Sequence, residues 1–355
     1  MLLKFISCSL KLTAAATCVA LSASTLPDLP EPVSNNAVAS TSIRGKTYIA
    51  SFMGIGPGKQ HSDIHNKAWM HTLGDFNWQS LPAVPSTQKV NGRIAASAVA
   101  LNNNFFVFGG FSVNADGSEQ TAVDSYRIDP VTKRYTKLND IPVPVDDAVA
   151  LTYQNRYVYL VSGWSDHGNV NLVQLFDNFT QRWSQATPFP GKPVFGLAGA
   201  MAGNTMLLCD GVALNYYADK KPTYQAEPAC YLGTVGDNAN KIDWRLIEHP
   251  TGTARYRMAA INTQIDGKDM LVFIGGSTNP YNYNGIGYNG QPSEPDSKVW
   301  VFSVADQRWL KALDTTPVMD LRSLIEIDGD IYSVGGMQQG QQVSPQLIKH
   351  QIKLQ

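Results

Sequence analysis

The chain has 355 residues, and its 28 Lys and Arg residues against 29 Asp and Glu residues give a formal net charge of −1. A charge this close to zero creates no field that would attract nucleic acid or an anionic membrane surface, so neither is expected as a partner. Charged residues form 16% of the chain, below the roughly 25% usual for soluble proteins, beside 29 Gly and 20 Pro. This composition favours many strands joined by tight turns.

The N-terminal residues have the pattern of a secretory signal peptide. Two lysines, Lys4 and Lys11, precede a core of apolar and small residues, and further small residues follow that core. We therefore predict a signal peptide over residues 1–23, a mature domain over residues 24–355 and a periplasmic or secreted protein. The apolar core is too short for a stable membrane span. A lipoprotein anchored through Cys18 is the alternative, although the three residues before this cysteine form a poor lipobox.

The cysteines divide between the two predicted segments. Cys8 and Cys18 lie in the signal peptide, so Cys209 and Cys230 remain in the mature chain. In an oxidising compartment such a pair is expected to form a disulfide rather than to supply a catalytic thiol. The bond would tie the end of one predicted strand to the start of the next.

Along the mature chain, a strand that ends at glycine recurs six times. The six segments are TYIASFMG, NFFVFGG, YVYLVSG, TMLLCDG, DMLVFIGG and DIYSVGG, and they end at Gly54, Gly110, Gly163, Gly211, Gly276 and Gly336. Successive copies lie 48 to 65 residues apart, the range of a repeat built from one four-stranded unit. A strand of small and aliphatic residues, such as AASAVAL, precedes each copy, and small side chains suit strands that crowd around a common axis.

After the glycines come a variable loop, a third strand, and a fourth strand that contains one aromatic residue. The aromatic residues of the fourth strands are Trp78, Tyr135, Trp183, Trp244 and Trp309. In this order of features the chain resembles the kelch repeat family, whose members fold as β-propellers. The resemblance implies an all-β, six-bladed kelch-type propeller. The glycines then end each second strand where it turns away between neighbouring blades, with no Cβ in the way.

The last unit has no fourth strand of its own, because the chain ends at Gln355 soon after its third strand. The mature N-terminal segment STLPDLPEP, residues 24–32, lies directly before the first small-residue strand, where a fourth strand would normally lie. We predict that this segment pairs with the C-terminal blade. The N-terminal strand would then close the ring and remove the exposed edges of an open sheet.

In a four-stranded blade, the loops between strands two and three and the loops that link consecutive blades lie on one face, so long loops there indicate the functional face. Basic residues recur on this side where blades begin: Arg93, Lys192, Arg255, Arg257 and Arg322. The four arginines are candidate contacts to a substrate carboxylate, since a guanidinium offers paired donors in a fixed geometry. The alternative is that they pair with Asp146, Asp147 or Asp320 and hold the blades together.

Aromatic and histidine residues of the same loops suggest sugar recognition. Tyr217 and Tyr283 would offer a ring face and a hydroxyl, although Tyr-rich loops can also pack on themselves. His167 is a candidate general base or substrate contact, the alternative being a surface histidine. The HSDIH segment, residues 61–65, could bind a metal only on a helix, and its setting indicates a loop. We therefore expect no metal site.

Two carboxylates flank the long loop of the fourth unit, Asp210 and Glu227, and either could act as a general acid or base. The chain also resembles the exported six-bladed N-acetylneuraminate mutarotases, or sialic acid epimerases. In that family the proposed carboxylate base follows the second strand of the fourth blade, in the context NGE. This chain has CDGVA there, with Val212 where the glutamate would lie. The resemblance therefore leaves Asp210 and Glu227 as the candidate catalytic residues.

Together these patterns predict an exported kelch propeller that needs no cofactor and acts on a small acidic sugar. The most specific form of this hypothesis is an N-acetylneuraminate mutarotase, which interconverts anomers by general acid–base catalysis. The alternative is a non-catalytic module that binds a glycan or a protein through its long blade loops.

Overall fold

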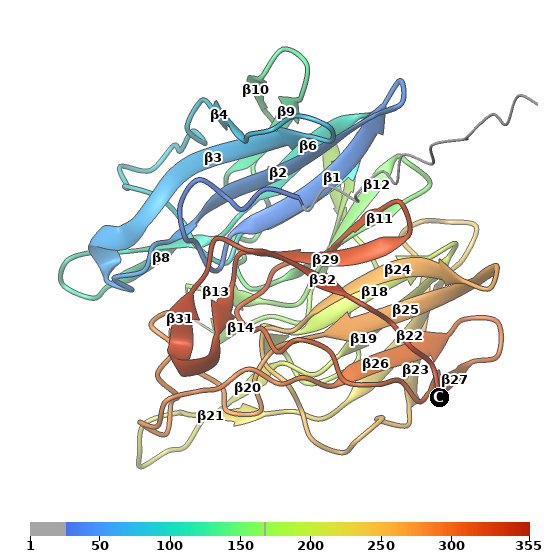
Figure 1. Cartoon of the computed structure of the whole chain (residues 1–355). Coiled ribbons are helices and arrows are strands. Elements are labelled where there is room, and N and C mark those ends of the chain that lie inside the picture. Colours follow the sequence, from blue (N-terminus) through green and yellow to red (C-terminus); the bar gives the residue numbers. More distant parts are fainter. Residues whose placement is uncertain (1–25, 167) are drawn as a thin grey trace, which may run out of the picture.

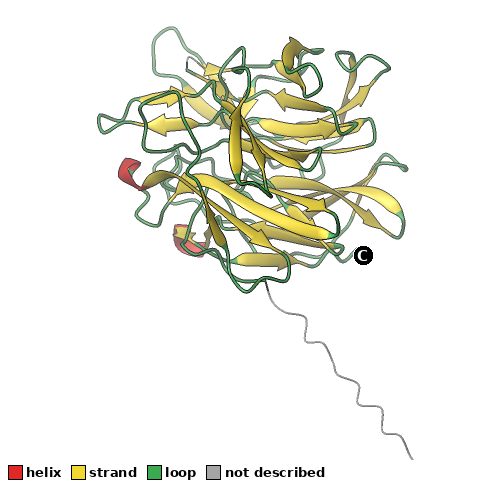
Figure 2. Cartoon of the chain, turned by 90° about the horizontal axis from the view of Figure 1, so that it is seen from above, coloured by secondary structure: helices red, strands yellow, loops and turns green. Residues whose placement is uncertain are grey.

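The computed structural model describes residues 26–166 and 168–355 (Figure 1). These residues form β-strands and two short 3₁₀ turns, η1 (His61–Asp63) and η2 (Gln339–Gln341) (Figure 2). None of the helical segments in this part of the chain is long and apolar enough to cross a membrane. The predicted signal peptide lies outside the described residues.

Apart from the small loop sheets, six antiparallel sheets follow one another along the described chain, five with four strands and one with three. The first sheet contains β1 (Ala37–Ile43), β2 (Lys46–Ile55), β3 (Ile64–Thr72) and β4 (Gln79–Leu81). The second contains β5 (Ser97–Leu101), β6 (Asn104–Phe108), β9 (Ser125–Asp129) and β10 (Arg134–Lys137). The third contains β11 (Val149–Tyr153), β12 (Tyr157–Val161), β15 (Val173–Asp177) and β16 (Arg182–Gln185).

The remaining three sheets come from the second half of the chain. The fourth contains β18 (Ala198–Ala202), β19 (Thr205–Cys209), β22 (Cys230–Val235) and β23 (Ile242–Ile247). The fifth contains β24 (Ala259–Ile265), β25 (Lys268–Ile274), β26 (Val299–Ser303) and β27 (Arg308–Leu310). The last contains β28 (Ile325–Ile327), β29 (Asp330–Val334) and β32 (Leu347–His350). In every sheet, neighbouring strands are also successive along the chain once the short hairpin strands are set aside, so each sheet is a local meander.

The first strand of each sheet lies closest to a common axis. The strands β1, β5, β11, β18, β24 and β28, with the residues beside them, line one cavity of about 370 Å³. Small side chains such as Ala98, Gly199 and Ala260 form much of its wall, which explains why the first strand of each repeat is rich in small residues. This arrangement confirms the all-β propeller prediction.

Short hairpins extend the loops that follow the second strands. They are β7 (Phe111–Val113) with β8 (Glu119–Thr121), β13 (Trp164–Ser165) with β14 (Gly168–Asn169), β20 (Val212–Asn215) with β21 (Thr223–Ala226), and β30 (Met337–Gln338) with β31 (Gln342–Val343). The strand β17 (Val194–Phe195), from the connection between the third and fourth sheets, pairs with β20. This pairing places both kinds of loop on one face, as the repeat pattern predicts.

The glycines at the ends of the second strands allow close approach of the neighbouring connection. A Cβ built on Gly110, where φ is +87°, would lie 2.7 Å from the carbonyl oxygen of Ile94. A Cβ on Gly276, where φ is +79°, would lie 2.7 Å from the backbone nitrogen of Met258. Both positions combine a left-handed backbone with a backbone contact that no side chain could tolerate, so the repeated glycine has a steric cause.

A circuit of hydrogen bonds joins the connections that lead into the first strands. It consists of Asn35 N to Asp320 O, Ala95 N to Asn35 Oδ1, Asp147 N to Ala95 O, Gly196 N to Asp147 O, Arg257 N to Gly196 O, and Leu321 N to Arg257 O. Several residues of the circuit have positive φ without being glycine, including Asp147 at 49° and Arg257 at 52°. Such conformations cost roughly 1–3 kcal/mol each and persist where the surrounding structure enforces them. The circuit thereby fixes the side chains that point toward the axis.

The aromatic residue of a fourth strand packs across the boundary between sheets. The ring of Trp183 lies 5.1 Å from that of Phe176 in its own sheet and 5.7 Å from that of Phe108 in the preceding sheet. Buried aromatic rings of this size contribute much of the apolar area that holds layers together. The Trp of the repeat therefore stabilises the contact between adjacent sheets.

The N-terminal segment contacts the last sheet without forming a strand in its described part. Leu29 N donates to Pro345 O at 2.8 Å, and Val33 N donates to Ser344 O at 3.3 Å. The indole Nε1 of Trp78 donates to Pro27 O at 2.9 Å, which ties the same segment to the first sheet. The last sheet has three strands within the described residues. Six complete blades and closure of the ring by an N-terminal strand therefore stay predictions.

Candidate functional site

A small pocket lies on the face that carries the long loops. Its volume is about 60 Å³, and residues from both kinds of loop line it. The lining residues are Phe111, Glu119, Asp146, Asp147, Trp164, Phe195, Tyr224, Arg257, Asn282, Tyr283 and Tyr288. At roughly 10–15 Å³ for each water, the pocket has room for about four to six water molecules.

A buried cluster of charged side chains forms the floor of this pocket. The guanidinium of Arg257 donates to both carboxylate oxygens of Asp147, at 3.1 and 2.6 Å, and to Oδ1 of Asp320 at 3.0 Å. Arg322 Nη1 donates to Asp147 Oδ1. All four side chains are at most 5% exposed. Ion pairing was the alternative role that the sequence offered for these arginines, and the structure contains it. Arg257 pairs with Asp147 and Asp320, and Arg322 pairs with Asp147.

The charge cluster separates the pocket from the cavity along the axis. Asp147 and Arg257 line the pocket, whereas Arg322 lines the axial cavity. Since Arg322 and Arg257 share Asp147 as a partner, the ion pairs span the boundary between the two spaces. A ligand in the pocket would therefore lie against buried arginine and aspartate side chains that are already paired with one another.

The carboxyl groups of the pocket differ in their affinity for protons. Burial opposes ionisation of Asp147, but the charges of Arg257 and Arg322 overcome it and lower the pKa of Asp147. Burial, reinforced by the negative charge of Asp147, raises the pKa of Asp146 well above its ordinary value. The pKa of Glu119 is also raised, because neighbouring groups remove water from its carboxyl and Asp147 adds negative charge. Asp146 is thus suited to hold a proton beside an ionised Asp147.

Aromatic rings form the walls of the pocket. The rings of Tyr224 and Tyr288 stack at 4.0 Å with an interplanar angle of 13°. Trp164 packs edge-on against Phe195 at 5.6 Å. Tyr283, a residue singled out from the sequence, lines the same pocket. Flat aromatic faces beside hydrogen-bonding groups suit the apolar face and the hydroxyls of a sugar.

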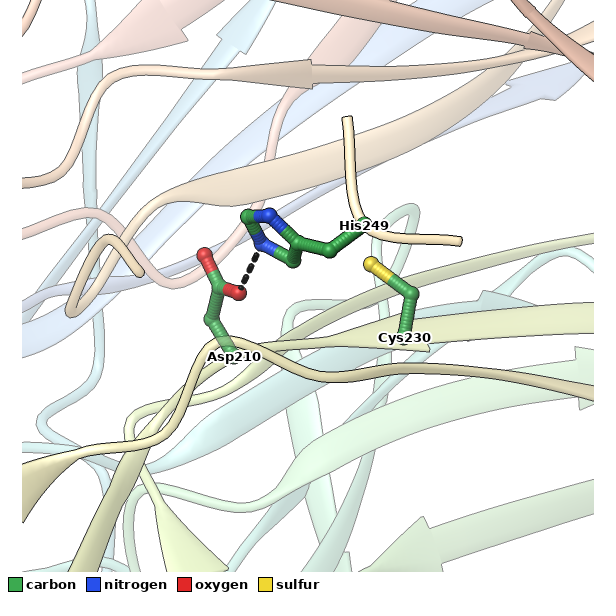
Figure 3. Close-up of side chains that lie close together, drawn as sticks. All are labelled: Asp210, Cys230 and His249. Carbon is green, nitrogen blue, oxygen red and sulfur yellow. Dashed lines mark hydrogen bonds and ion pairs between the residues drawn. The ribbon is translucent and has the colours of Figure 1, made fainter. Parts of the chain in front are cut away.

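Asp210 lies away from this pocket and is bonded to structural partners (Figure 3). Its Oδ1 lies 2.7 Å from His249 Nε2, and its Oδ2 accepts the N–H of Arg255 at 2.7 Å. His249 Nδ1 accepts the N–H of Gly252 at 2.8 Å, so Nε2 is the ring nitrogen that donates to Asp210. Burial raises the pKa of Asp210, although His249 opposes this rise. The pair ties the end of β19 to the connection that leads into the fifth sheet.

Two further candidates from the fourth unit have clear positions. Glu227 forms an ion pair with Lys192 at 2.7 Å near the surface and does not line the pocket. Cys209 and Cys230 form a disulfide between directly paired residues of β19 and β22, which confirms the predicted bond.

The arginines Arg93 and Arg255 are buried in contacts with the backbone. Arg93 donates to Gly109 O at 2.9 Å, and its Nη1 lies 3.7 Å from Asp124. Arg255 donates to Gly275 O at 3.0 Å and stacks on Trp300 at 4.0 Å. Neither lines the pocket, and both hold a connection against the strand end of the same sheet.

Of the two loop tyrosines predicted as substrate contacts, Tyr283 lines the pocket and Tyr217 does not. Tyr217 is 42% exposed, Lys220 lies over its ring at 3.9 Å, and it does not line the pocket. His167 lies outside the described residues.

The HSDIH segment forms the 3₁₀ turn η1 and the first residues of β3, and its side chains are not among the described groups that lie close enough to hold a metal. The described His, Cys, Asp and Glu side chains contain one group close enough to hold a metal, namely Asp210, Cys230 and His249. Because the sulfur of Cys230 is bonded to Cys209, it is not available as a thiolate ligand.

Sequence reasoning missed most of the pocket. Asp146 was considered only as an ion-pair partner, and Glu119, Trp164 and Tyr224 were not singled out. Glu119 lies in one of the long loops, and Asp146 directly precedes the residue of positive φ in its connection. These positions are the available signals, but nothing local distinguishes Glu119 from the other polar residues of its loop.

Comparisons with known proteins place the chain among kelch relatives, although no family model matches it. It is 24% identical to the N-acetylneuraminate epimerase of Shigella sonnei over 295 residues, 73% of this chain and 72% of that protein. It is 25% identical to Kelch domain-containing protein 3 of Bos taurus over 266 residues, 69% of this chain and 64% of that protein. Kelch-like protein 15 of Gallus gallus is 27% identical over 115 residues, which span 23% of that protein.

A solved structure described as "Structure of YjhT" matches the fold with a TM-score of 0.71 at 17% identity, over 94% of this chain and 100% of that chain. The similarity extends over nearly the whole chain and confirms the kelch-type β-propeller fold. Together with the curated relatives, it confirms the resemblance that the repeats indicate.

Proposed function

We propose, from the homology of this chain to kelch-domain proteins and N-acetylneuraminate epimerases, that it interconverts the anomers of a small sugar in the loop-side pocket. The finer form of the proposal is mutarotation of N-acetylneuraminate, the sugar in the relatives' name. The observation that carries the assignment to this pocket is the pair of carboxyl groups, Glu119 and Asp146, that face an aromatic-walled space.

Anomer interconversion needs one base and one acid near the same sugar ring. Glu119 would accept the proton of the anomeric hydroxyl while Asp146 gives a proton to the ring oxygen. The bond between the anomeric carbon and the ring oxygen breaks, and a carbonyl forms. After rotation of the open chain, the ring closes on the other face, Glu119 returns its proton to the carbonyl oxygen and Asp146 recovers the proton of the ring hydroxyl. No cofactor or net redox change enters this cycle.

The roles follow the environments of the two groups. Asp146 is buried at 3% exposure, and its raised pKa favours the protonated form that an acid requires. Glu119 lies on the rim strand β8, where it can exchange its proton with solvent. Asp147 stays ionised through Arg257 and Arg322, and its negative charge helps to keep the neighbouring Asp146 protonated.

Asp210 is a poorer candidate because it is held by His249 and Arg255 outside the pocket. The position that matches the glutamate of the mutarotase motif, Val212, is fully buried in an apolar cluster with Phe195 and Tyr256. The acid–base pair proposed here therefore comes from the second sheet and the connection that follows it.

Proton NMR of freshly dissolved α-N-acetylneuraminate, followed to the β anomer with catalytic amounts of the mature chain, tests the proposal. We expect acceleration by the wild type and a large loss of it in Glu119→Gln and in Asp146→Asn. Glu248→Gln, which changes an exposed carboxyl outside the pocket, serves as the matched control. Full activity in both pocket variants would overturn the assignment of the acid and the base.

A non-catalytic module that binds a glycan or a protein is the second candidate. The exposed Tyr217 on the hairpin loop, with Lys220 over its ring, favours it because such residues recur in binding surfaces. If saturation-transfer NMR detected ligand binding without any anomer acceleration, and Tyr217→Ala abolished that binding, the module would be the better account.

We also propose that the protein is exported to the periplasm or the medium. The signal-peptide pattern and the disulfide between Cys209 and Cys230 support this proposal, since such bonds persist in oxidising compartments. Fractionation of cells that express the full chain, with mass spectrometry of the mature N-terminus, tests it; uncleaved protein in the cytosol would contradict it.

A further inference from the structure

The cations of the pocket are already occupied by carboxylates of the protein. Arg257 donates three hydrogen bonds, two to Asp147 and one to Asp320. Arg322 donates to Asp147 and to the carbonyl oxygen of Leu321. Of the described residues that line the pocket, Arg257 is the one cation. A ligand carboxylate would have to compete with two internal carboxylates for the same guanidinium groups.

The acceptors of the pocket, in contrast, are incompletely used. Asp146 is buried at 3% exposure, and its Oδ2 accepts the hydroxyl of Thr121 at 3.0 Å. Its Oδ1 accepts no hydrogen bond within the described part of the chain, although Asp146 lines the pocket. Glu119 lines the same pocket, and its carboxyl likewise receives no hydrogen bond from the described residues. Glu119 is exposed, whereas for the buried Asp146 an acceptor oxygen without a donor is unfavourable unless water or a ligand supplies one.

The balance of charged groups also favours a ligand that donates hydrogen bonds over a ligand that carries a carboxylate. The pocket and its floor contain four carboxyl groups, on Glu119, Asp146, Asp147 and Asp320, against two guanidinium groups, on Arg257 and Arg322. The two guanidinium groups neutralise Asp147 and Asp320. An added carboxylate would then face the carboxylate of Glu119 without a counter-charge, whereas a hydroxyl or an ammonium group would supply the missing donors.

We infer that the pocket selects a monosaccharide whose contacting groups donate hydrogen bonds, a neutral or amino sugar, over a sugar carboxylate. This inference rests on the proposed function, because it concerns the same pocket and the same carboxyl groups. It keeps the anomer interconversion of the proposed function but ranks neutral and amino sugars above N-acetylneuraminate, the acidic sugar in the relatives' name.

A matched series of sugars tests the selection. Galactose, galactosamine and galacturonate share one ring and differ in a single substituent, and glucose, glucosamine and glucuronate form a second such series. With the mature wild-type chain, binding is measured by saturation-transfer NMR and anomer interconversion by proton NMR, with N-acetylneuraminate as a further acidic ligand. We expect the neutral and amino sugars of at least one series to bind at least tenfold more tightly than their uronate.

The outcomes separate the two proposals. Equal or tighter binding of the uronates or of N-acetylneuraminate overturns the inference, and their acceleration would leave the proposed mutarotase function intact. Selective binding of neutral or amino sugars without acceleration upholds the inference and overturns the catalytic proposal. Binding of none of these sugars overturns both.

Variants that remove the free acceptors give a second test. The substitutions Glu119→Gln and Asp146→Asn keep the size of each side chain but replace one acceptor oxygen by a donor NH₂ group. We expect Glu119→Gln, alone and with Asp146→Asn, to reduce the preference for the neutral over the acidic sugar at least tenfold. Glu248→Gln should leave the ratio unchanged. An unaltered ratio in folded Glu119→Gln and double-variant proteins would show that these carboxyls do not set the selection.

Discussion

Two buried aspartates of this propeller resemble each other locally and differ in what they face. Asp147 and Asp210 have positive φ angles of 49° and 66°, and both accept hydrogen bonds from a different connection of the ring. Asp147 contacts Arg257 and Arg322 on the axis and lines the pocket. Asp210 contacts His249 and the backbone of Arg255 beside the disulfide and does not line it.

The difference teaches that burial, unusual backbone and a perturbed pKa do not by themselves identify a functional carboxylate. Burial raises the pKa of Asp210, yet its oxygens are occupied by the protein itself. Asp146 has a raised pKa as well, but it retains one oxygen toward the pocket. A group can act on a ligand only if an atom of it remains free to touch that ligand.

The largest expected effect comes from breaking the axial cluster. Arg257→Ala would leave Asp147 and Asp320 buried with incomplete compensation, so we expect a loss of about 3–5 kcal/mol in the free energy of unfolding. Urea denaturation followed by tryptophan fluorescence measures it, and Arg257→Lys serves if the alanine variant does not fold.

The matched control for this variant is Arg156→Ala, which removes an ion pair with Asp177 at 2.7 Å on the surface. Because Arg156 is 44% exposed, its loss should cost no more than about 1 kcal/mol. Equal losses in the two variants would contradict the importance given to the axial cluster.

A buried histidine far from the pocket should control stability against acid. His350 lies in β32 between Thr315 and Ser333, and burial lowers its pKa to about 4. An unfolded histidine titrates near 6.5, so the unfolded chain binds this proton more readily. The contribution of the neutral form is complete above pH ~6.5 and is lost as the pH falls toward 4, by about 3 kcal/mol in total.

Melting temperatures measured from pH 7 to pH 4 for the wild type and His350→Gln check this expectation. The wild type should lose more stability than the variant over that interval. Parallel curves would mean that His350 is not the group responsible.

Removing the charge of Asp210 should affect stability but not chemistry. In Asp210→Asn the amide oxygen can still accept the N–H of Arg255, while His249 loses its acceptor, at a cost of about 1–3 kcal/mol. Asp146→Asn, in contrast, keeps an acceptor for Thr121 and should abolish anomer interconversion. Thermal melts and the NMR assay on both variants compare the two sites directly. A folded but inactive Asp210→Asn variant would show that Asp210 takes part in the reaction.

The smallest effect is expected for Glu227. Its ion pair with Lys192 lies near the surface, where Lys192 is 57% exposed, so Glu227→Gln should change stability by less than about 1 kcal/mol. The rate of anomer interconversion should stay at the wild-type value. A strong loss of rate would restore Glu227 as a candidate acid or base.

Much of the fold could be predicted because its signals are local. The glycine that ends each second strand is required by a left-handed backbone and a contact with the neighbouring connection, as at Gly110. Trp183 could be assigned to a fourth strand from its place in the repeat. Cys209 and Cys230 pair because they end one strand and begin the next in a single sheet.

The site could be predicted only in part. Arg257 and Tyr283 were named from their loops, and both line the pocket. Glu119 and Asp146 could not be distinguished from other polar loop residues, because nothing in their neighbouring residues reports which way a loop turns. Asp210 does not line the pocket, and its oxygens accept hydrogen bonds from His249 and from the backbone of Arg255, which lie much later in the chain and which its own neighbours do not reveal.

The sequence by itself determined the repeat, its strands and turns, the aromatic residue of the fourth strand and the disulfide, because each depends on residues close together in one unit. The tertiary structure alone decided which side chains meet. The pocket joins Glu119 of the second sheet's loop, Asp147 of the following connection and Arg257 from the start of the fifth sheet. The hydrogen-bonded circuit around the axis brings the distant Asp147 and Arg257 together, and their mutual pairing leaves Asp146 and Glu119 as the carboxyl groups that face the ligand space.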